Sequence, residues 1–342
     1  MSVATAPTPA SALSILDRLR TPRTLIALVL LMWVPLSSYV FFGRHLGAAQ
    51  DLVLLPAIPA VLLLYIIAFR AWSESPIAVI GLTLVFFWLL MAVTAPYLPL
   101  IDPNRPIAPF QMPGSTVDGQ TFWLGTDMRG RDVLARAIWG CQRVIVWGVT
   151  ATLCAYVVGT AFGLVAGYLS GWWDEIISFF ANVLLSFPVM VLFILVLNYL
   201  GQSGVNIVIA VTFASAPAIM RIVRGLTLDI KTRDYIYAAQ TRGEHPTYIM
   251  LIELLPNVRG PLIVDACLRL GYTTVAITTL TFLGLGLQPP DPDWGLMIRE
   301  ASASALLWQF SYMLIVPALS VSSLILGFNL MADGLREMSL RD

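Results

Sequence analysis

The sequence TLDIKTRDYIYAAQTRGEHPTYIMLIELLPNVRG, at residues 227–260, is a long polar stretch in a chain that is otherwise mostly apolar. It contains Lys231, which is the only lysine of the chain. Apolar stretches of membrane-spanning length lie on both sides of it. The stretch therefore predicts a large polar loop between membrane helices, and the rest of the chain is organised on either side of it.

Within this stretch, residues 234–242 have the spacing of a short helix. The face that this spacing predicts consists of Tyr235, Ala238, Ala239 and Arg242. Gly243 supplies a stop after the helix, and Pro246 suits the first turn of a second helix. We therefore expect two short helices that meet at a glycine. The small side chains at 238, 239 and 243 would let another protein approach closely.

The composition excludes a soluble protein. Of the 342 residues, 58% are hydrophobic and 12% are charged, and the mean hydropathy is +0.81. The formal net charge is zero, which gives no support for binding to nucleic acid. The three cysteines, Cys141, Cys154 and Cys267, have no disulfide or metal-site spacing and are interpreted as small core residues.

Eight apolar stretches are long enough, or nearly so, to cross a bilayer as helices. They are residues 24–42, 52–69, 77–98, 144–169, 178–200, 207–225, 261–287 and 310–331. Pro56 and Pro59 predict a kink near the start of the second stretch, which could also be tilted or re-entrant. Pro188 predicts a kink inside the fifth stretch, where the bend could line a pathway or serve packing alone.

Basic residues near the ends of these stretches favour both termini on the cytoplasmic side, by twelve against seven. We therefore expect a cytoplasmic tail at 1–23, followed by a hairpin of two spans at 24–73. The main membrane domain would be 74–342, with an outer loop at 99–143 and a cytoplasmic loop at 226–260. Trp172, Trp173 and Asp174 are expected to form a tight inner turn whose indoles anchor at the interface.

The outer loop contains the sequence WLGTDMRGRDVL at residues 123–134. Gly130 breaks the chain, and Asp132 can cap the helix that follows. We interpret Asp127 and Asp132 as turn and cap residues, because calcium would need more oxygen ligands. Arg131, Arg136 and Arg143 are expected to be charges at the membrane interface.

A second notable sequence, TFLGLGLQPPDPDWG, occupies residues 281–295. It lacks the GK[ST] of a phosphate loop. Its glycines would allow close helix packing, and its prolines would end the helix at the outer face. In the preceding span, Asp265 and Arg269 can pair four residues apart near the cytoplasmic end. That pair could be structural or could contact a substrate.

Several of these segments resemble one family, the C-type permease subunits of the dipeptide, oligopeptide and nickel ABC importers. Ala238, Ala239, Gly243, Leu255 and Pro256 resemble the family's EAA loop, with Tyr237 in place of its glutamate. The outer-loop residues that match are Gly125, Thr126, Asp127, Gly130, Arg131 and Asp132. A possible pathway or outer-face segment matches at Pro188, Phe282, Gly284, Gly286, Pro289, Pro290 and Trp294. The sequence NLMADGLR at residues 329–336 resembles the family's ending, so the resemblance runs from about residue 77 to residue 342.

The resemblance implies an all-α polytopic membrane protein. Its fold would be a type I ABC-importer permease core of six transmembrane helices, with the hairpin at 24–73 added. The implied partners are a second permease subunit, two ATPase subunits and an extracytoplasmic substrate-binding protein. ATP and magnesium would be used by the partners, and no cofactor, metal or catalytic residue is expected in this chain. Di- or oligopeptides lead as substrates, ahead of nickel chelates and glycosides, in the inner membrane of a prokaryote.

The sequence gives little support to two other classes of protein. An ion-coupled secondary transporter would need ionisable residues near the membrane midplane or inverted repeats, and neither is clear. A membrane-embedded enzyme would need a cluster of catalytic groups, but His45 and His245 lie far apart. Lys231 follows no glycine-rich loop, so energy would have to come from another polypeptide.

Overall fold

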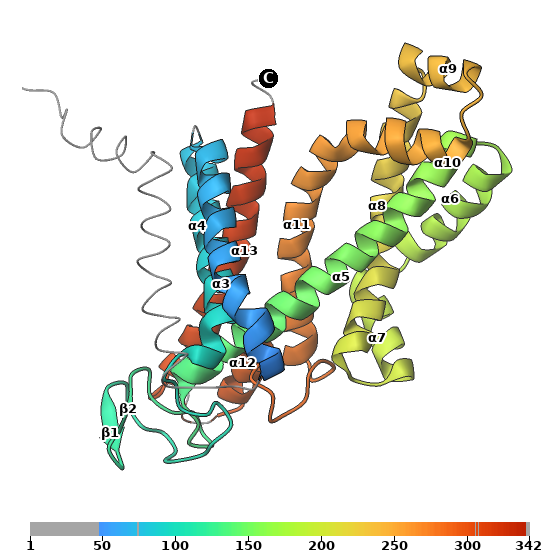
Figure 1. Ribbon diagram of the computed structural model, residues 1–342. Coiled ribbons are helices and arrows are strands. Elements are labelled where there is room, and N and C mark those ends of the chain that lie inside the picture. The colour runs from blue at the N-terminus through green and yellow to red at the C-terminus, as the bar shows by residue number, and fades with distance from the viewer. Residues whose placement is uncertain (1–47, 74, 305, 307, 340–342) are drawn as a thin grey trace, which may run out of the picture.

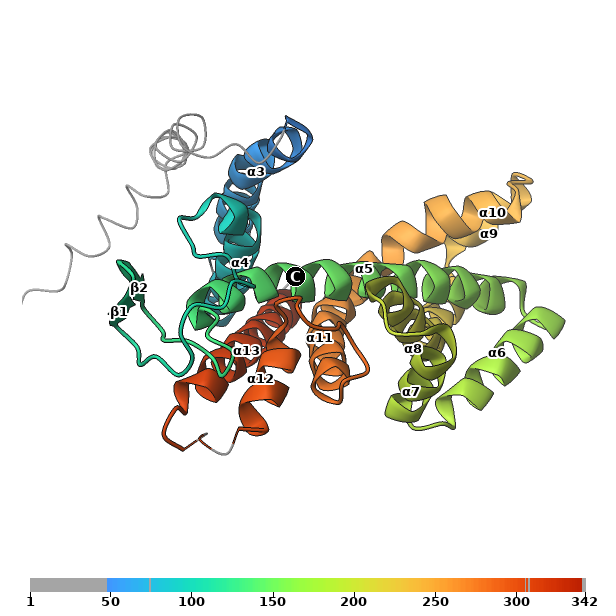
Figure 2. The same cartoon turned by 90° about the horizontal axis from the view of Figure 1, so that it is seen from below.

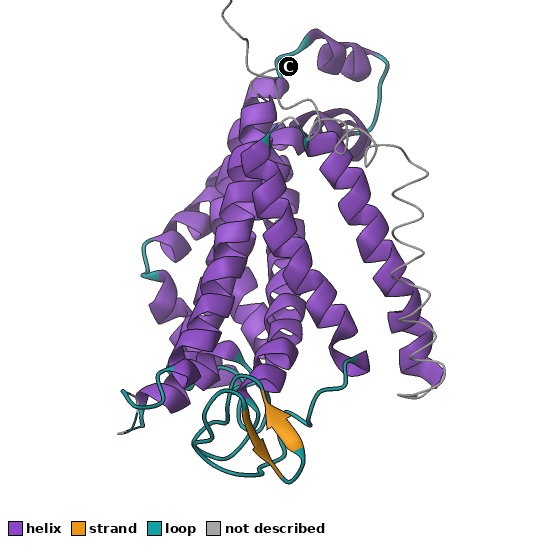
Figure 3. Ribbon diagram, turned by 90° about the vertical axis from the view of Figure 1, so that its left-hand side faces the viewer, coloured by secondary structure: helices purple, strands orange, loops and turns teal. Residues whose placement is uncertain are grey.

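A computed structural model describes residues 48–73, 75–304, 306 and 308–339 (Figure 1). The expected tail at 1–23 and the first expected span at 24–42 lie outside these residues. The described chain is a bundle of helices with a loop region at one end and the short helix α9 at the other (Figures 1 and 3). We call these the loop end and the α9 end.

Five helical segments in the described part of the chain are long and apolar enough to cross a membrane. Those segments are Pro76–Tyr97, Val133–Leu169, Gly204–Ile230, Pro246–Phe282 and Tyr312–Met338. A sixth crossing exists if a bent helix pair at 172–200 is counted as one span. The chain is therefore an all-α polytopic membrane protein, and these six crossings correspond to the six core spans that the sequence predicts.

The core helices have the following bounds. They are α4 (Pro76–Thr94) with the 3-10 turn η1 (Ala95–Tyr97), α5 (Val133–Leu169), α6 (Trp172–Leu185), α7 (Val189–Leu200), α8 (Gly204–Ile230), α11 (Leu255–Phe282) and α13 (Tyr312–Ser339). Between α8 and α11 lie α9 (Asp234–Thr241), α10 (Pro246–Tyr248) and the π-helical turn η2 (Ile249–Leu254). Before them comes α3 (Ala48–Trp72), which packs on α4 and contains the second expected span.

The fifth expected span is broken rather than kinked. Its two halves, α6 and α7, meet at an angle of 92°. Proline has no N–H to continue the helix, and Pro188 adopts an extended ψ of 129° at the break. The expected tight turn at Trp172 is also wrong in detail. The chain turns at Ser170 and Gly171, both with φ of 58°, and Trp172 already begins α6.

The helix α5 crosses the whole bundle diagonally and packs along α8 (Figures 1 and 2). Three glycines on α5, at 159, 163 and 167, face α8 along this contact. A Cβ at Gly163 would lie 2.6 Å from the Cβ of Val223, so only glycine permits the approach. Close packing through small residues is how membrane helices associate without a hydrophobic driving force.

The loop end is built from the 99–132 loop and the helix α12 (Trp294–Ser302). The loop contains a two-stranded antiparallel hairpin, β1 (Ser115–Val117) and β2 (Gln120–Phe122). Figure 3 shows this hairpin below the helices. The proline-rich part of the loop forms no helix, as its prolines predict.

Candidate functional site

The first candidate site is α9 with the turns on either side of it, residues 231–254. The helix starts at Asp234 and ends before Gly243, which has φ of 76°, so the predicted helix and its glycine stop are confirmed. Ile236 and Ala239 are both 0% exposed and pack into a cluster formed by α5, α8, η2 and α11. These two side chains hold α9 against the membrane helices.

The predicted outward face of α9 is therefore wrong by about one residue. Ala239 is buried, so it is not available to another protein. Tyr237, Ala238 and Gly243 are exposed, and no atom lies within 4 Å of a Cβ built on Gly243. Ile236 and Ala239 lie three residues apart, which is also a helical spacing, and the apolar Ile236 was the signal for this buried face.

Lys231 fastens the joint between α8 and α9 to the end of α5. Its Nζ donates hydrogen bonds to the backbone oxygen of Tyr168, at 2.5 Å, and to Oγ of Ser170, at 3.0 Å. A cation at the C-terminal end of a helix also interacts favourably with the helix dipole. In the sequence this lysine is notable only for its rarity, and no local pattern indicates these contacts.

Leu255 and Pro256 lie on α11 rather than on the α9 surface. The π turn η2 ends just before Pro256, whose ring would collide with the carbonyl of residue 252 in a regular α-helix. Leu255 packs partly against the cluster that holds α9, and Pro256 is exposed. Arg242 lies 3.6 Å from Glu244 and 3.7 Å from Glu253, and so connects α9 to η2.

The second candidate site is the outer-loop signature at residues 125–132. Asp132 caps α5, because its carboxylate accepts hydrogen bonds from the N–H groups of Leu134 and Ala135. Burial raises the pKa of Asp132, and those two N–H groups oppose the increase. The predicted cap is confirmed, and α5 accordingly begins at Val133, eleven residues before the predicted span.

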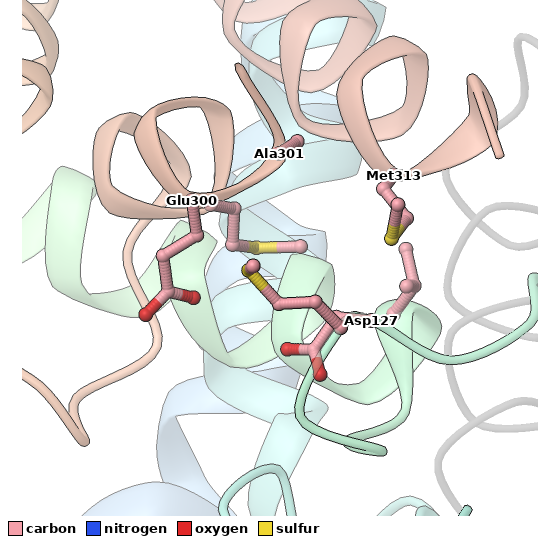
Figure 4. A pocket seen from close by; sticks show the side chains of 7 residues that line it. Asp127, Glu300, Ala301 and Met313 are labelled. Atoms are coloured by element: carbon pink, nitrogen blue, oxygen red, sulfur yellow. The ribbon is translucent and has the colours of Figure 1, made fainter. Parts of the chain in front are cut away.

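Asp127 and Arg131 form an ion pair that also reaches α12. Arg131 donates from Nε to Asp127 at 2.7 Å, and its Nη2 contacts Glu300. Figure 4 shows Asp127 and Glu300 beside one small cavity with Met313. The cavity measures about 10 Å³, which is at most the space of one water. This part of the signature fastens the loop to α12 and leaves no room for a ligand.

Other residues of the signature also connect loops. Thr126 donates to the carbonyl of Ala108 at 2.6 Å, and Tyr312 of α13 donates to the carbonyl of Thr126 at 2.9 Å. Gly125 has φ of 75°, and a Cβ there would lie 2.7 Å from the Tyr312 ring. Glu300 and Tyr312, which complete this arrangement, were missed because no local sequence pattern connects them to residue 126.

Arg136 corrects a prediction. Expected at the membrane interface, it is 0% exposed and donates to the carbonyls of Pro103, at 3.2 Å, and Pro290, at 3.4 Å. Its position on the first turns of α5 places it between two proline-rich loops. Its partners lie far away in the sequence, so helical spacing alone could not reveal them.

The 282–294 segment lies at the loop end. Gly284 has φ of 79°, and a Cβ on Gly286 would lie 2.1 Å from the Thr281 side chain, so both glycines are needed sterically. Trp294 is 0% exposed and donates to the carbonyl of Ala137 at 2.8 Å. It is a packing residue rather than a pathway residue. Phe282 is exposed, and Pro289 and Pro290 lie in the loop that precedes α12.

A Gly130→Val substitution is expected to disrupt the loop end. Gly130 has φ of 80°, and a Cβ there would lie 3.0 Å from the backbone of Ala108. The left-handed backbone alone costs a branched residue about 1–2 kcal/mol. We expect at least a severalfold loss of folded protein in detergent, measured by size-exclusion chromatography. Gly119→Val is the control, because Gly119 has a similar φ of 74° but no atom close to an added Cβ. It therefore shows the backbone strain without the steric clash. Equal yields of the two variants would contradict the role of the Ala108 contact.

A third group of residues lies within the membrane helices. Oδ2 of Asp265 accepts from Nε of Arg269 at 2.7 Å and from the hydroxyl of Tyr156. The predicted pair on α11 is confirmed, but Arg269 lies in the middle of the helix rather than at its end. With a rise of about 1.5 Å per residue, Arg269 is roughly 20 Å from Phe282. The group therefore lies about midway along α11, in a helical segment that is long and apolar enough to cross a membrane.

These features are those of a multi-pass membrane transport subunit, and comparisons with known proteins agree. The family model described as "Binding-protein-dependent transport system inner membrane component" matches residues 159–338. The chain belongs to this family of ABC-importer permeases. The family is a transport permease family and not an enzyme family.

Three curated relatives show the same relationship. The glutathione transport system permease protein GsiD of Pectobacterium atrosepticum is 38% identical over 215 residues, covering 63% of this chain and 71% of the relative. The dipeptide transport system permease protein DppC of Alkalihalophilus pseudofirmus is 32% identical over 270 residues, covering 79% and 87%. DppC of Haemophilus influenzae is 34% identical over 265 residues, covering 76% and 88%.

Proposed function

We propose that this permease is one of two permease subunits of an ATP-driven importer of di- or oligopeptides, and that residues 231–254 dock on an ATPase. The supporting observation is the construction of α9. Ile236 and Ala239 anchor the helix, while Tyr237, Ala238 and Gly243 remain exposed on the other side. A helix that is held firmly from behind can transmit movement from a partner to the bundle.

The remaining parts of the proposal follow from the family. The second permease would complete the translocation pathway, and two ATPase subunits would use ATP and magnesium. An extracytoplasmic binding protein would deliver the substrate to the loop end. The peptide substrate class rests on the glutathione and dipeptide transport named for the relatives. This chain would contribute the pathway and the helices that move, and we propose no cofactor for it.

Co-purification in mild detergent tests the assignment. We expect a tagged chain to recover two ATPase polypeptides and a second permease, and Lys231→Gln to weaken their recovery because the joint between α8 and α9 is released. Lys231→Arg, which keeps a cation near the end of α5, is the matched control. Recovery of the chain without any ATPase would favour an ion-coupled secondary transporter instead. Transport that persists without ATP and follows an ion gradient would identify that alternative.

The proposed topology places both termini and α9 in the cytoplasm. Reporter fusions after Gln50 and after Gly119 are then expected to report the outside, because Gln50 lies one crossing and Gly119 three crossings from the cytoplasmic N-terminus. Gly119 occupies the tip of the hairpin at the loop end. A fusion after Gly243 is the inside control. A cytoplasmic signal after Gln50 would remove the additional hairpin from the topology.

A further inference from the structure

The polar group on α11 lies beside a second cavity, distinct from the small one at Asp127. The cavity measures about 310 Å³ and lies between α7, α8 and α11. Its walls include Val189, Met190 and Phe193, together with Ser215, Arg269 and Tyr272. The volume is at the lower end of the range of small-molecule sites. Arg269 is its only charged lining residue among those the structure describes.

The guanidinium of Arg269 has capacity beyond its ion pair. Arginine carries five N–H donors, and the hydrogen bond to Asp265 uses the one at Nε. Asp265 also accepts a hydrogen bond from the hydroxyl of Tyr156, which stabilises its carboxylate from a second side. A charged residue within a membrane-spanning helix is costly and marks a functional site by default. The Nη groups can therefore engage a second acceptor without releasing Asp265.

The same chain contains an arginine that binds two carboxylates at once. Arg131 contacts Asp127 and Glu300 together, and its side chain is 4% exposed. Nη2 makes both contacts, because each terminal nitrogen of a guanidinium carries two N–H donors. At Arg269 one edge is occupied by Asp265, and the cavity lies where a second carboxylate could bind.

We infer that Arg269 binds the free C-terminal carboxylate of a peptide in the translocation pathway. Tyr272, one helical turn further along α11 and 65% exposed, would lie next to the bound peptide. The apolar wall of α7 would accept its side chains. This inference rests on the proposed peptide function, and it makes the carboxylate a feature that the permease itself recognises.

The test uses the complete importer in proteoliposomes with its binding protein. The probes are dialanine, trialanine and glutathione, each compared with its C-terminal amide. We expect the wild type to import the free acid faster than the amide, and Arg269→Gln to reduce that ratio roughly tenfold, as for the loss of one charge-assisted hydrogen bond. The same binding protein serves every variant, so its own preference cancels in the comparison.

Two further variants separate recognition from folding. Asp265→Asn/Arg269→Gln removes both charges, so it leaves no unpaired carboxylate in the membrane, and it is also expected to lose the preference. Arg259→Gln is the same change on the same helix outside this cavity, and it is expected to keep the wild-type ratio. An unchanged ratio in the double variant, or its failure to assemble, would make the pair structural and overturn the inference.

The remaining outcomes distinguish the two proposals. Equal import of acid and amide by the wild type would overturn the role of Arg269 while leaving peptide import intact. Import of none of the three peptides by an assembled, ATP-hydrolysing complex would overturn the peptide function, and the inference with it.

Discussion

Gly243→Val is expected to abolish transport and the stimulation of ATP hydrolysis by loaded binding protein, while the permease remains in the membrane. The glycine has φ of 76°, which a β-branched residue resists by about 1–2 kcal/mol. It also lies on the exposed side of α9, where added volume would meet a docking partner. Interface cores pack as densely as protein interiors, so little extra volume is tolerated. The measurement is ATPase activity of the reconstituted complex with and without loaded binding protein.

Two companion variants divide this effect into its causes. Gly243→Asn keeps the left-handed backbone, because asparagine tolerates it, but adds volume at the surface. Gly260→Ala adds a methyl group on α11, at a site that also has open space but an ordinary φ. We expect Gly243→Asn to be impaired and Gly260→Ala to behave as the wild type. Wild-type stimulation in Gly243→Val would remove residues 231–254 from ATPase coupling.

Tryptophan substitutions at the two adjacent alanines are expected to have opposite consequences. Ala239 is 0% exposed in the cluster that holds α9, so Ala239→Trp should displace the helix and reduce folded protein severely. Overpacking of a well-packed core costs roughly 1–3 kcal/mol or more. Ala238 is exposed, so Ala238→Trp should fold normally and block ATPase docking. Thermal stability in detergent and ATPase stimulation are the two measurements.

The pair contains its own control, because the same side chain is introduced one residue apart. Normal stability of Ala239→Trp would contradict the burial of that face. Normal stimulation in a folded Ala238→Trp would show that the exposed face does not meet an ATPase.

The sequence was sufficient for features that depend on local backbone chemistry. Apolar length predicted the six core crossings, Asp132 predicted the cap of α5, and Gly243 predicted the end of α9. Each of these depends on residues within one or two helical turns. The positions of these residues in the candidate sites were therefore predictable before their neighbours were known.

Features that depend on distant partners were not predictable. In the sequence Arg136 looks like an interfacial arginine. Only the fold shows that it donates to the carbonyls of Pro103 and Pro290. The outward face of α9 was misplaced because short helices offer two overlapping stripes, and the cluster that selects between them comes from other helices. The break at Pro188 exceeded the predicted kink because the chain can leave the helical path completely where α7 packs on α8.

The helix α5 has a mechanical consequence. It contains 37 residues and is thus about 55 Å long, with Asp132 fixing one end and Lys231 holding the other. A rigid rod of that length works as a lever, so a tilt of about 10° displaces the far end by roughly 10 Å. The close contact of Gly159, Gly163 and Gly167 with α8 supports this helix near the end that Lys231 holds. A movement beside α9 can thus be transmitted to the loop end by α5 itself, without successive side-chain rearrangements between the two ends.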